Sequence, residues 1–256
     1  MDRNASREAV EGETEEASNA GGSAKEKGKG RGRPAMVIEV APLKLTQFQL
    51  TLVGETPLIM NNFNQRGQGL ADMRDRMLGV PAPKKGNRPP KDPLRAFRDS
   101  LYSHDEPKVK GTLKGFLAGK KVTATGSFYV LFSMLKGSIE TAATDVDGAS
   151  KAGVRRAVRV IEYTPKLIHK APPYMVEHVT RLPTGAPDLR YRARFDDWAV
   201  TFTVQVNSAV LSFERVVNLF NTAGFTSGLG DWRPEHGGEF GRFHVKGGSA
   251  HTRPTK

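Results

Sequence analysis

Hydrophobic and polar residues alternate most regularly over residues 198–207, whose sequence is WAVTFTVQVN. Trp198 and every second residue after it are hydrophobic, and the residues between them are alanine, threonine and glutamine. This period of two predicts a strand with one buried face. A second alternation, over 43–54, predicts another such strand with Phe48, Leu50 and Leu52 on its buried face.

A period of three to four residues follows the first of these strands. Over 212–224 the hydrophobic residues recur at helical spacing, Ser212 is a suitable N-cap, and Gly224 is expected to end the helix. A further helix is predicted from Ser133 to the Asp-Gly turn at 147–148.

The rest of the chain predicts shorter elements. We expect strands at 157–163 and 241–245, a hairpin within 174–195, and short helices within 70–78 and 93–102. Between the first strand and the helix at Ser133 lies a basic insertion, at about 64–125, whose prolines at 79–93 argue against a helix or a central strand there.

Composition and charge narrow the function classes. The 256 residues carry a net charge of +12 and include no cysteine, so disulfides, thiolate metal sites and cysteine nucleophiles are excluded. A positive excess of this size favours polyanions, of which nucleic acid is the commonest, and we expect a nucleic-acid partner. No hydrophobic run approaches the ~20 residues that cross a bilayer, so no membrane contact is expected and a cytoplasmic location is predicted.

The charge is unevenly distributed along the N-terminal segment. Residues 1–24 hold six acidic and two basic side chains and little to bury, whereas 25–36 are rich in lysine, arginine and glycine. We predict that 1–36 is a disordered tail, that 37–246 fold as one domain, and that 247–256 form a flexible C-terminal tail.

The sequence RGRP at 31–34 resembles the core of the AT-hook, a DNA-binding segment. A glycine between two arginines is thin enough to enter a narrow minor groove, and flanking lysines can neutralise phosphates. The predicted contacts are Lys27, Lys29, Arg31, Gly32 and Arg33. The alternative is a basic tether that contacts phosphates without selectivity.

A glycine-rich stretch, GFTSGLGDWRPEHGGEFGRFHV at 224–245, connects the helix to the last strand. Glycines at this density let main-chain N–H groups approach a ligand, and the stretch adds two arginines and a tryptophan. Trp232 is either a base-stacking platform or part of the core. The predicted contacts here are Gly228, Gly230, Trp232, Arg233, Gly238 and Arg242.

The helix, the sequence GLGDWRPEHGGEFGRF and the strand together resemble the glycine-rich loop of the RAMP superfamily, which includes backbone subunits and RNA-processing enzymes of CRISPR effector complexes. The resemblance implies an α+β fold: a ferredoxin-like (RRM-type) domain with an antiparallel sheet, here with a large basic insertion. The sequences TPLIMNNF, KDPLRAFRDSLY and GLGDWRPEHGG are also similar to a loosely characterised group of phage and mobile-element proteins.

The RAMP resemblance implies that single-stranded DNA or RNA lies along the domain surface and that copies of the chain associate. The basic sequence SKAGVRRAVRV at 150–160, which overlaps a predicted strand beginning at RRAVRV (155–160), would then line the nucleic-acid path. The alternative is a solvated strand edge protected by charge. The predicted contacts in this region are Lys120, Lys121, Lys136, Lys151, Arg155, Arg156 and Arg159.

Catalysis has few candidates in this sequence. The histidines show no metal-binding spacing, so no metal or cofactor is expected. Asp196 and Asp197 would either shape a turn or bind Mg²⁺. As in some RAMP enzymes, His236 beside Arg233 would act as a general acid or base in metal-independent RNA cleavage. Binding of nucleic acid without catalysis is the main prediction, and a protein-interaction factor is the third hypothesis.

Overall fold

The computed structural model describes residues 42–62, 73–75, 77–81, 90, 92–181 and 184–246. The predicted tails at 1–36 and 247–256, with the five AT-hook-like contacts of the N-terminal tail, lie outside these residues, as does part of the predicted insertion.

The first of two antiparallel sheets has the strand order β10-β1-β9-β5, with β6 also paired to β9. Its strands are β1 (Leu45–Gly54), β5 (Val158–Val160), β6 (Leu167–His169), β9 (Trp198–Asn207) and β10 (Phe243–Lys246). Helices α4 (Phe132–Ala142) and α5 (Lys151–Ala157) precede β5, and α6 (Phe213–Thr226) joins β9 to β10. Short 3-10 turns, η1 (Ala143–Asp145) and η2 (Pro234–His236), follow α4 and α6. This order is that of a ferredoxin-like domain, and it confirms the predicted α+β fold class.

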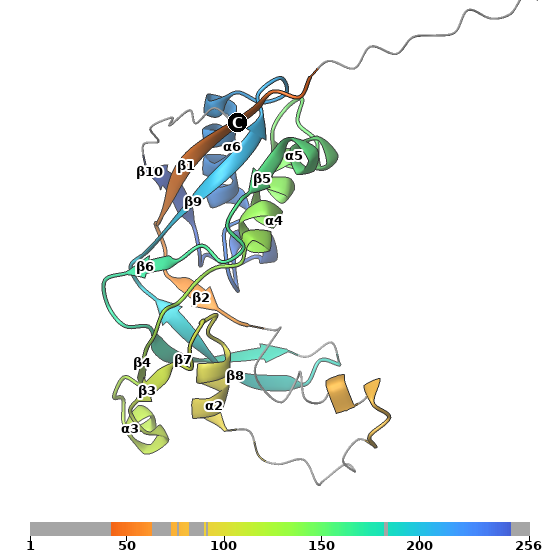
Figure 1. Cartoon of the computed structure of the whole chain (residues 1–256). Coiled ribbons are helices and arrows are strands. Elements are labelled where there is room, and N and C mark those ends of the chain that lie inside the picture. Colours follow the sequence, from red (N-terminus) through yellow and green to blue (C-terminus); the bar gives the residue numbers. More distant parts are fainter. Residues whose placement is uncertain are drawn as a thin grey trace, which may run out of the picture. The chain divides into compact units, whose positions relative to one another are not determined.

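The two faces of the first sheet differ as the alternation predicts. Phe202 of β9 packs on Phe220 of α6 with ring centroids 5.5 Å apart, and Phe48 of β1 packs on Phe213 at 4.9 Å. On the opposite face β1 and β9 present glutamine and threonine, and the Thr51 and Thr201 hydroxyls lie 2.9 Å apart. Figure 1 shows α4, α5 and α6 beside this sheet.

A second sheet, which the sequence patterns did not predict as a unit, has the order β2-β8-β7-β4-β3. Its strands are β2 (Leu58–Met60), β3 (Lys108–Lys110), β4 (Thr123–Thr125), β7 (Tyr174–Arg181) and β8 (Pro187–Phe195). Strands β7 and β8 are the predicted hairpin. One face of the sheet packs on α2 (Pro93–Asp99) and α3 (Leu113–Leu117), as the edge-on contact of Phe116 with Tyr191 shows.

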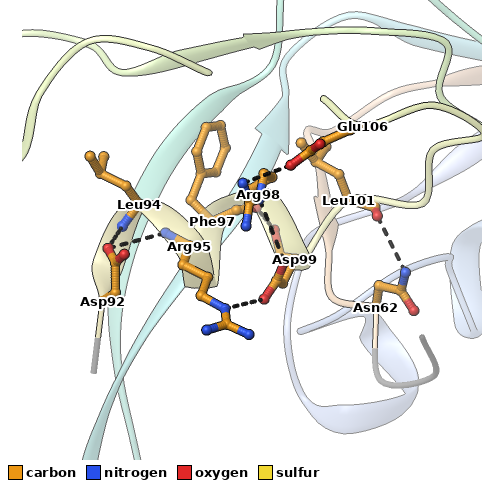
Figure 2. A network of polar contacts seen from close by, with 10 residues as sticks. Asn62, Asp92, Leu94, Arg95, Phe97, Arg98, Asp99, Leu101 and Glu106 are labelled. Atoms are coloured by element: carbon orange, nitrogen blue, oxygen red, sulfur yellow. Dashed lines mark hydrogen bonds and ion pairs between the residues drawn. The ribbon is translucent and has the colours of Figure 1, made fainter. Parts of the chain in front are cut away.

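Helix α2 begins where its sequence predicts. The Asp92 carboxylate accepts hydrogen bonds from the main-chain N–H groups of Leu94 and Arg95 at 3.0 and 3.2 Å, and Phe97 is fully buried (Figure 2). The basic side chains of the helix have acidic partners: Arg98 lies 2.9 Å from Glu106, and Arg95 lies 3.5 Å from Asp99. The cations of α2 are therefore engaged within the protein.

Two local predictions are wrong. Residues 155–157, predicted as the start of a strand, belong to helix α5, because the Ser150 hydroxyl caps the turn at Gly153, and Val154 and Ala157 are buried at helical spacing. Gly224 does not end α6, which continues to Thr226. A Cβ at Gly224 would lie 1.8 Å from the Phe243 carbonyl oxygen, so this glycine lets α6 pack closely against β10.

Candidate nucleic-acid interface

The glycine-rich stretch forms a loop between α6 and β10 that is bonded along its length to β2. The N–H of Asp231 donates to the Ile59 carbonyl and the N–H of Gly241 donates to the Pro57 carbonyl, both at 2.8 Å. Gly241 has a φ of 71°, and a Cβ there would lie 1.8 Å from the Leu229 carbonyl oxygen. These glycines therefore permit close main-chain packing in a conformation that other residues rarely adopt.

A groove of about 360 Å³ lies between α4 and this loop. Met134, Gly137, Ser138 and Thr141 line its helix side, and the loop side runs from Gly228 to Glu235. Three of the predicted contacts, Gly228, Gly230 and Arg233, thus lie in one groove. Lys136 is half-buried on the helix that forms the other wall.

The charges in the groove are paired. Arg233 Nε and Nη2 lie 2.9 and 2.7 Å from Glu235 Oε2, and Arg233 Nη1 donates to the Gly230 carbonyl at 3.0 Å. Thr141 donates to the other carboxylate oxygen at 3.3 Å. Although burial raises the pKa of Glu235, the bonds from Arg233 outweigh it, and the net pKa is lowered. Glu235 is therefore an ionised acceptor at neutral pH.

Trp232 is half-buried and has a φ of 54°. Its ring centroid lies 4.5 Å from that of His178 on β7 and 6.4 Å from that of Phe240 in the same loop. The guanidinium of Arg192 lies 5.7 Å from the Trp232 ring centroid. The loop thus covers part of the second sheet with aromatic side chains.

Beneath the loop lies a buried ion pair. Arg192 on β8 is 2% exposed, and its Nη2 lies 3.1 Å from Asp231 Oδ2, which also accepts from Asn61 at 2.9 Å. Within the described chain, Arg192 Nε and Nη1 and His178 Nδ1 are buried and have no hydrogen-bond partner. Burial, followed by the charge of Arg192, lowers the pKa of His178, so the ring is neutral at pH 7.

The face of the second sheet away from α2 and α3 is rich in basic side chains, and we call it the cationic face. Tyr174 pairs with Thr123 and with Arg194 in register, so side chains of β4, β7 and β8 share this face. Lys121 Nζ lies 4.1 Å from the Tyr174 ring centroid and Arg194 lies 5.8 Å from it. The cationic face consists of Lys108, Lys110, Lys121, Tyr174, Arg190 and Arg194. Arg190 and Arg194 are paired with Asp188 at 3.4 Å and Asp196 at 2.7 Å, and Arg192, on the same side of β8, is buried beneath the loop.

Sequence reasoning selected Lys120 and Lys121 here but missed their neighbours. Residues 108–121 contain five lysines and no acidic residue, a signal visible in the sequence. All five lysines are exposed, and no ion pair is found for them among the described residues. The alternation of Lys108 and Lys110 around the half-buried Val109 places both on the same side of edge strand β3.

The other predicted contacts lie elsewhere. Lys151, Arg155 and Arg156 are on α5 and Arg159 is on β5, at the opposite edge of the first sheet from β10. Arg155 Nη2 lies 2.7 Å from Glu140. Arg242 lies 3.4 Å from Glu239 and covers the exposed Phe225 ring. Gly238 serves packing, since a Cβ there would meet the Trp232 carbonyl. The structure therefore does not gather all predicted residues into one surface.

The histidine and aspartate candidates for catalysis are placed as follows. His236 is exposed at the end of η2, and its main-chain N–H donates to the Arg233 carbonyl at 2.9 Å. Asp196 accepts from Arg194 and Tyr174 at 2.7 and 3.2 Å in the turn between β8 and β9. Across the described ranges, no three His, Asp or Glu side chains are grouped as a metal site would require.

No protein-family model matches the chain, and no curated protein matches it. Among solved structures, one that is similar is a chain of a type III-B Cmr-beta complex bound to cognate target RNA, with 11% identity and a TM-score of 0.43. The match covers 80% of this chain and 60% of that chain. A likeness of this size does not establish a shared function. None of the described helices is long and hydrophobic enough to cross a bilayer.

Proposed function

We propose that this chain binds nucleic acid and holds a single strand on its cationic face. The observation that carries the proposal is a lysine cluster without ion-pair partners among the described residues, beside a tyrosine: Lys108, Lys110 and Lys121 are exposed, and Lys121 lies over Tyr174. Lysines neutralise phosphates, and an aromatic ring on a sheet face offers a stacking surface for an unpaired base. The glycine-rich loop borders this face through Trp232 and Phe240.

The test is a titration of labelled 20-mers of DNA and RNA by fluorescence anisotropy at about 50 to about 500 mM salt. If about six phosphates are contacted, the slope of log affinity against log salt is about −4 on single strands. Replacing Lys108, Lys110 and Lys121 together by alanine should reduce the magnitude of this slope by about 2. The matched control removes three exposed lysines from other places, Lys44, Lys166 and Lys170.

The outcomes separate the alternatives. Equal losses in the two triple variants would mean that only the net charge matters, and the cationic face would not be the site. A larger loss on replacing Lys151, Arg156 and Arg159 would move the interface to α5 and β5. Affinity that does not depend on salt would refute nucleic-acid binding by phosphate contact.

Two further parts of the proposal rest on the sequence. The AT-hook-like segment would contact duplex DNA, so deleting residues 25–35 should weaken duplex binding more than single-strand binding. Self-association is supported only by the RAMP resemblance. Light scattering with and without a 40-mer would show whether the chain assembles along nucleic acid, and a constant monomer mass would reject this part alone.

A further inference from the structure

The groove between α4 and the glycine-rich loop differs in chemistry from the cationic face. Its volume of about 360 Å³ lies in the range of small-molecule sites. Hydroxyl groups of α4 and the charged pair of the loop line it together with two hydrophobic side chains, Met134 and Leu229. A ligand here would meet both apolar and polar surface.

The groove does not suit a phosphate. The guanidinium of Arg233 already donates to Glu235 through Nε and Nη2 and to the Gly230 carbonyl through Nη1. Its positive charge is therefore balanced within the wall. Its partner, the Glu235 carboxylate, only accepts hydrogen bonds and so offers a phosphate nothing to bind. The groove favours an uncharged ligand that carries N–H or O–H donors.

One polar group of the groove has no hydrogen-bond partner within the described chain. Ser138 lines the groove, is 4% exposed, and its hydroxyl has no hydrogen-bond partner in the part of the chain that the structure describes. A buried hydroxyl without a partner is costly, and a ligand that bonded to it would remove that cost. Met134, which is half-buried on the helix side of the groove, offers hydrophobic contact to a flat ring.

We propose that this groove binds a nucleobase, with Glu235 accepting from ring or exocyclic N–H groups and Ser138 supplying a hydroxyl. The inference rests on the proposed function, because a bound single strand would supply the base, but it concerns a separate site. The same loop connects the two sites, since Asp231 pairs with Arg192 of the second sheet while Gly230 and Arg233 line the groove.

Gly137 gives a clean way to close the groove. It lines the groove on the exposed side of α4, and a Cβ built there has no atom within 4 Å. Gly137→Leu therefore adds bulk at a position where the Cβ itself meets no atom, and a leucine favours the helix over glycine, so the variant is expected to fold. Circular dichroism of the variant checks that a loss of binding does not reflect unfolding. The matched control is Ala152→Leu, an exposed helical position on α5 outside the groove.

The experiment compares a 20-mer carrying bases with a 20-mer of abasic sugar phosphate. The unsubstituted chain and Ala152→Leu should bind the base-carrying strand at least tenfold more tightly than the abasic strand. Gly137→Leu should reduce this preference at least fivefold while keeping the salt slope, because the cationic face is intact. Calorimetry with the four free ribonucleosides, and with inorganic phosphate, tests the groove without a polymer.

Each result has one meaning for the groove. A preference for bases that Gly137→Leu leaves unchanged would overturn the inference, since the bases would then be recognised elsewhere. Binding of inorganic phosphate that Gly137→Leu abolishes would overturn it as well. If neither 20-mer binds but a nucleoside binds and Gly137→Leu removes it, the groove inference stands and the proposed function fails. If the 20-mers bind by charge alone and no nucleoside binds, the proposed function stands and the groove inference fails.

Discussion

In the ion pair between Arg192 and Asp231, the arginine is far more buried than the aspartate. We therefore expect that removing the aspartate destabilises the fold more than removing the arginine. Arg192 is 2% exposed and Asp231 is 24% exposed, with Nη2 and Oδ2 3.1 Å apart. Two other guanidinium nitrogens of Arg192 have no partner among the described residues. If the Asp231 carboxylate is removed, Arg192 loses its ion-pair partner. The charge of Asp188 and the Trp232 ring, 5.7 Å away, then compensate the buried positive charge only weakly.

Asp231→Ala should lower the free energy of unfolding by about 3 kcal/mol, the lower end of the range for breaking a buried pair, because water reaches the aspartate side. Arg192→Met should cost about 1 kcal/mol, since methionine keeps the hydrophobic stem and the carboxylate remains partly hydrated. Asp231 also still accepts hydrogen bonds from Asn61 and from the Trp232 main chain at 2.9 and 3.1 Å. The double variant should lose about 2 kcal/mol less than the sum of the two single variants.

Urea unfolding followed by circular dichroism measures all three free energies. Arg155→Met, at a pair with Glu140 in which the arginine is exposed, serves as a control and should shift the midpoint much less than Asp231→Ala. If Asp231→Ala proved as mild as this control, or if the two single effects simply added, Arg192 would not be the desolvated, singly paired cation described here.

Two further predictions concern the same loop and its surroundings. Burial holds the pKa of His178 below its ordinary value of 6.5, so near that pH the unfolded chain binds a proton more readily than the folded chain does. The free energy of unfolding should therefore fall as the pH drops below about 6.5. His178→Gln should flatten this pH dependence, whereas His236→Gln should not. An unchanged dependence in His178→Gln urea titrations would reject the assignment. Gly241→Ala should lower the free energy of unfolding by more than about 3 kcal/mol, because its Cβ would clash with the Leu229 carbonyl and its φ is left-handed. Gly237→Ala should lower it by only about 1 kcal/mol, because Gly237 has a φ of 73° but open space around its Cβ. Equal thermal midpoints for the two variants would contradict this.

The long, regular elements of the fold were predictable because the hydrophobic residues of each buried face recur at one constant spacing along the sequence. The strand at 198–207 and the helix that begins at Ser212 follow their patterns closely, and Ser212 accepts from the Arg215 N–H at 3.3 Å. The second sheet was not predictable as a unit. Its strands β2, β3 and β4 have three residues each, too few to show a period. In addition, β2 pairs with β8 and β4 pairs with β7, both far along the chain.

The candidate sites were predictable in part for similar reasons. The density of glycines located the loop, but their contacts with main-chain carbonyls of distant residues, such as Gly230 with Ile59, depend on tertiary packing. The charges of Arg155, Arg233 and Arg242 were visible in the sequence, and their carboxylate partners were not. The lysines at 108–121 were visible but needed the sheet to place them beside Tyr174.

The hydrogen bonds that join the glycine-rich loop to β2 and Pro57 affect the conformational entropy that binding would cost. A segment with so many glycines would ordinarily lose much conformational freedom when it closes on a ligand. Here the carbonyls of Pro57 and Ile59 already immobilise it. The loop is thus preorganised, and a molecule that docks on it meets a rigid template whose ordering was completed during folding.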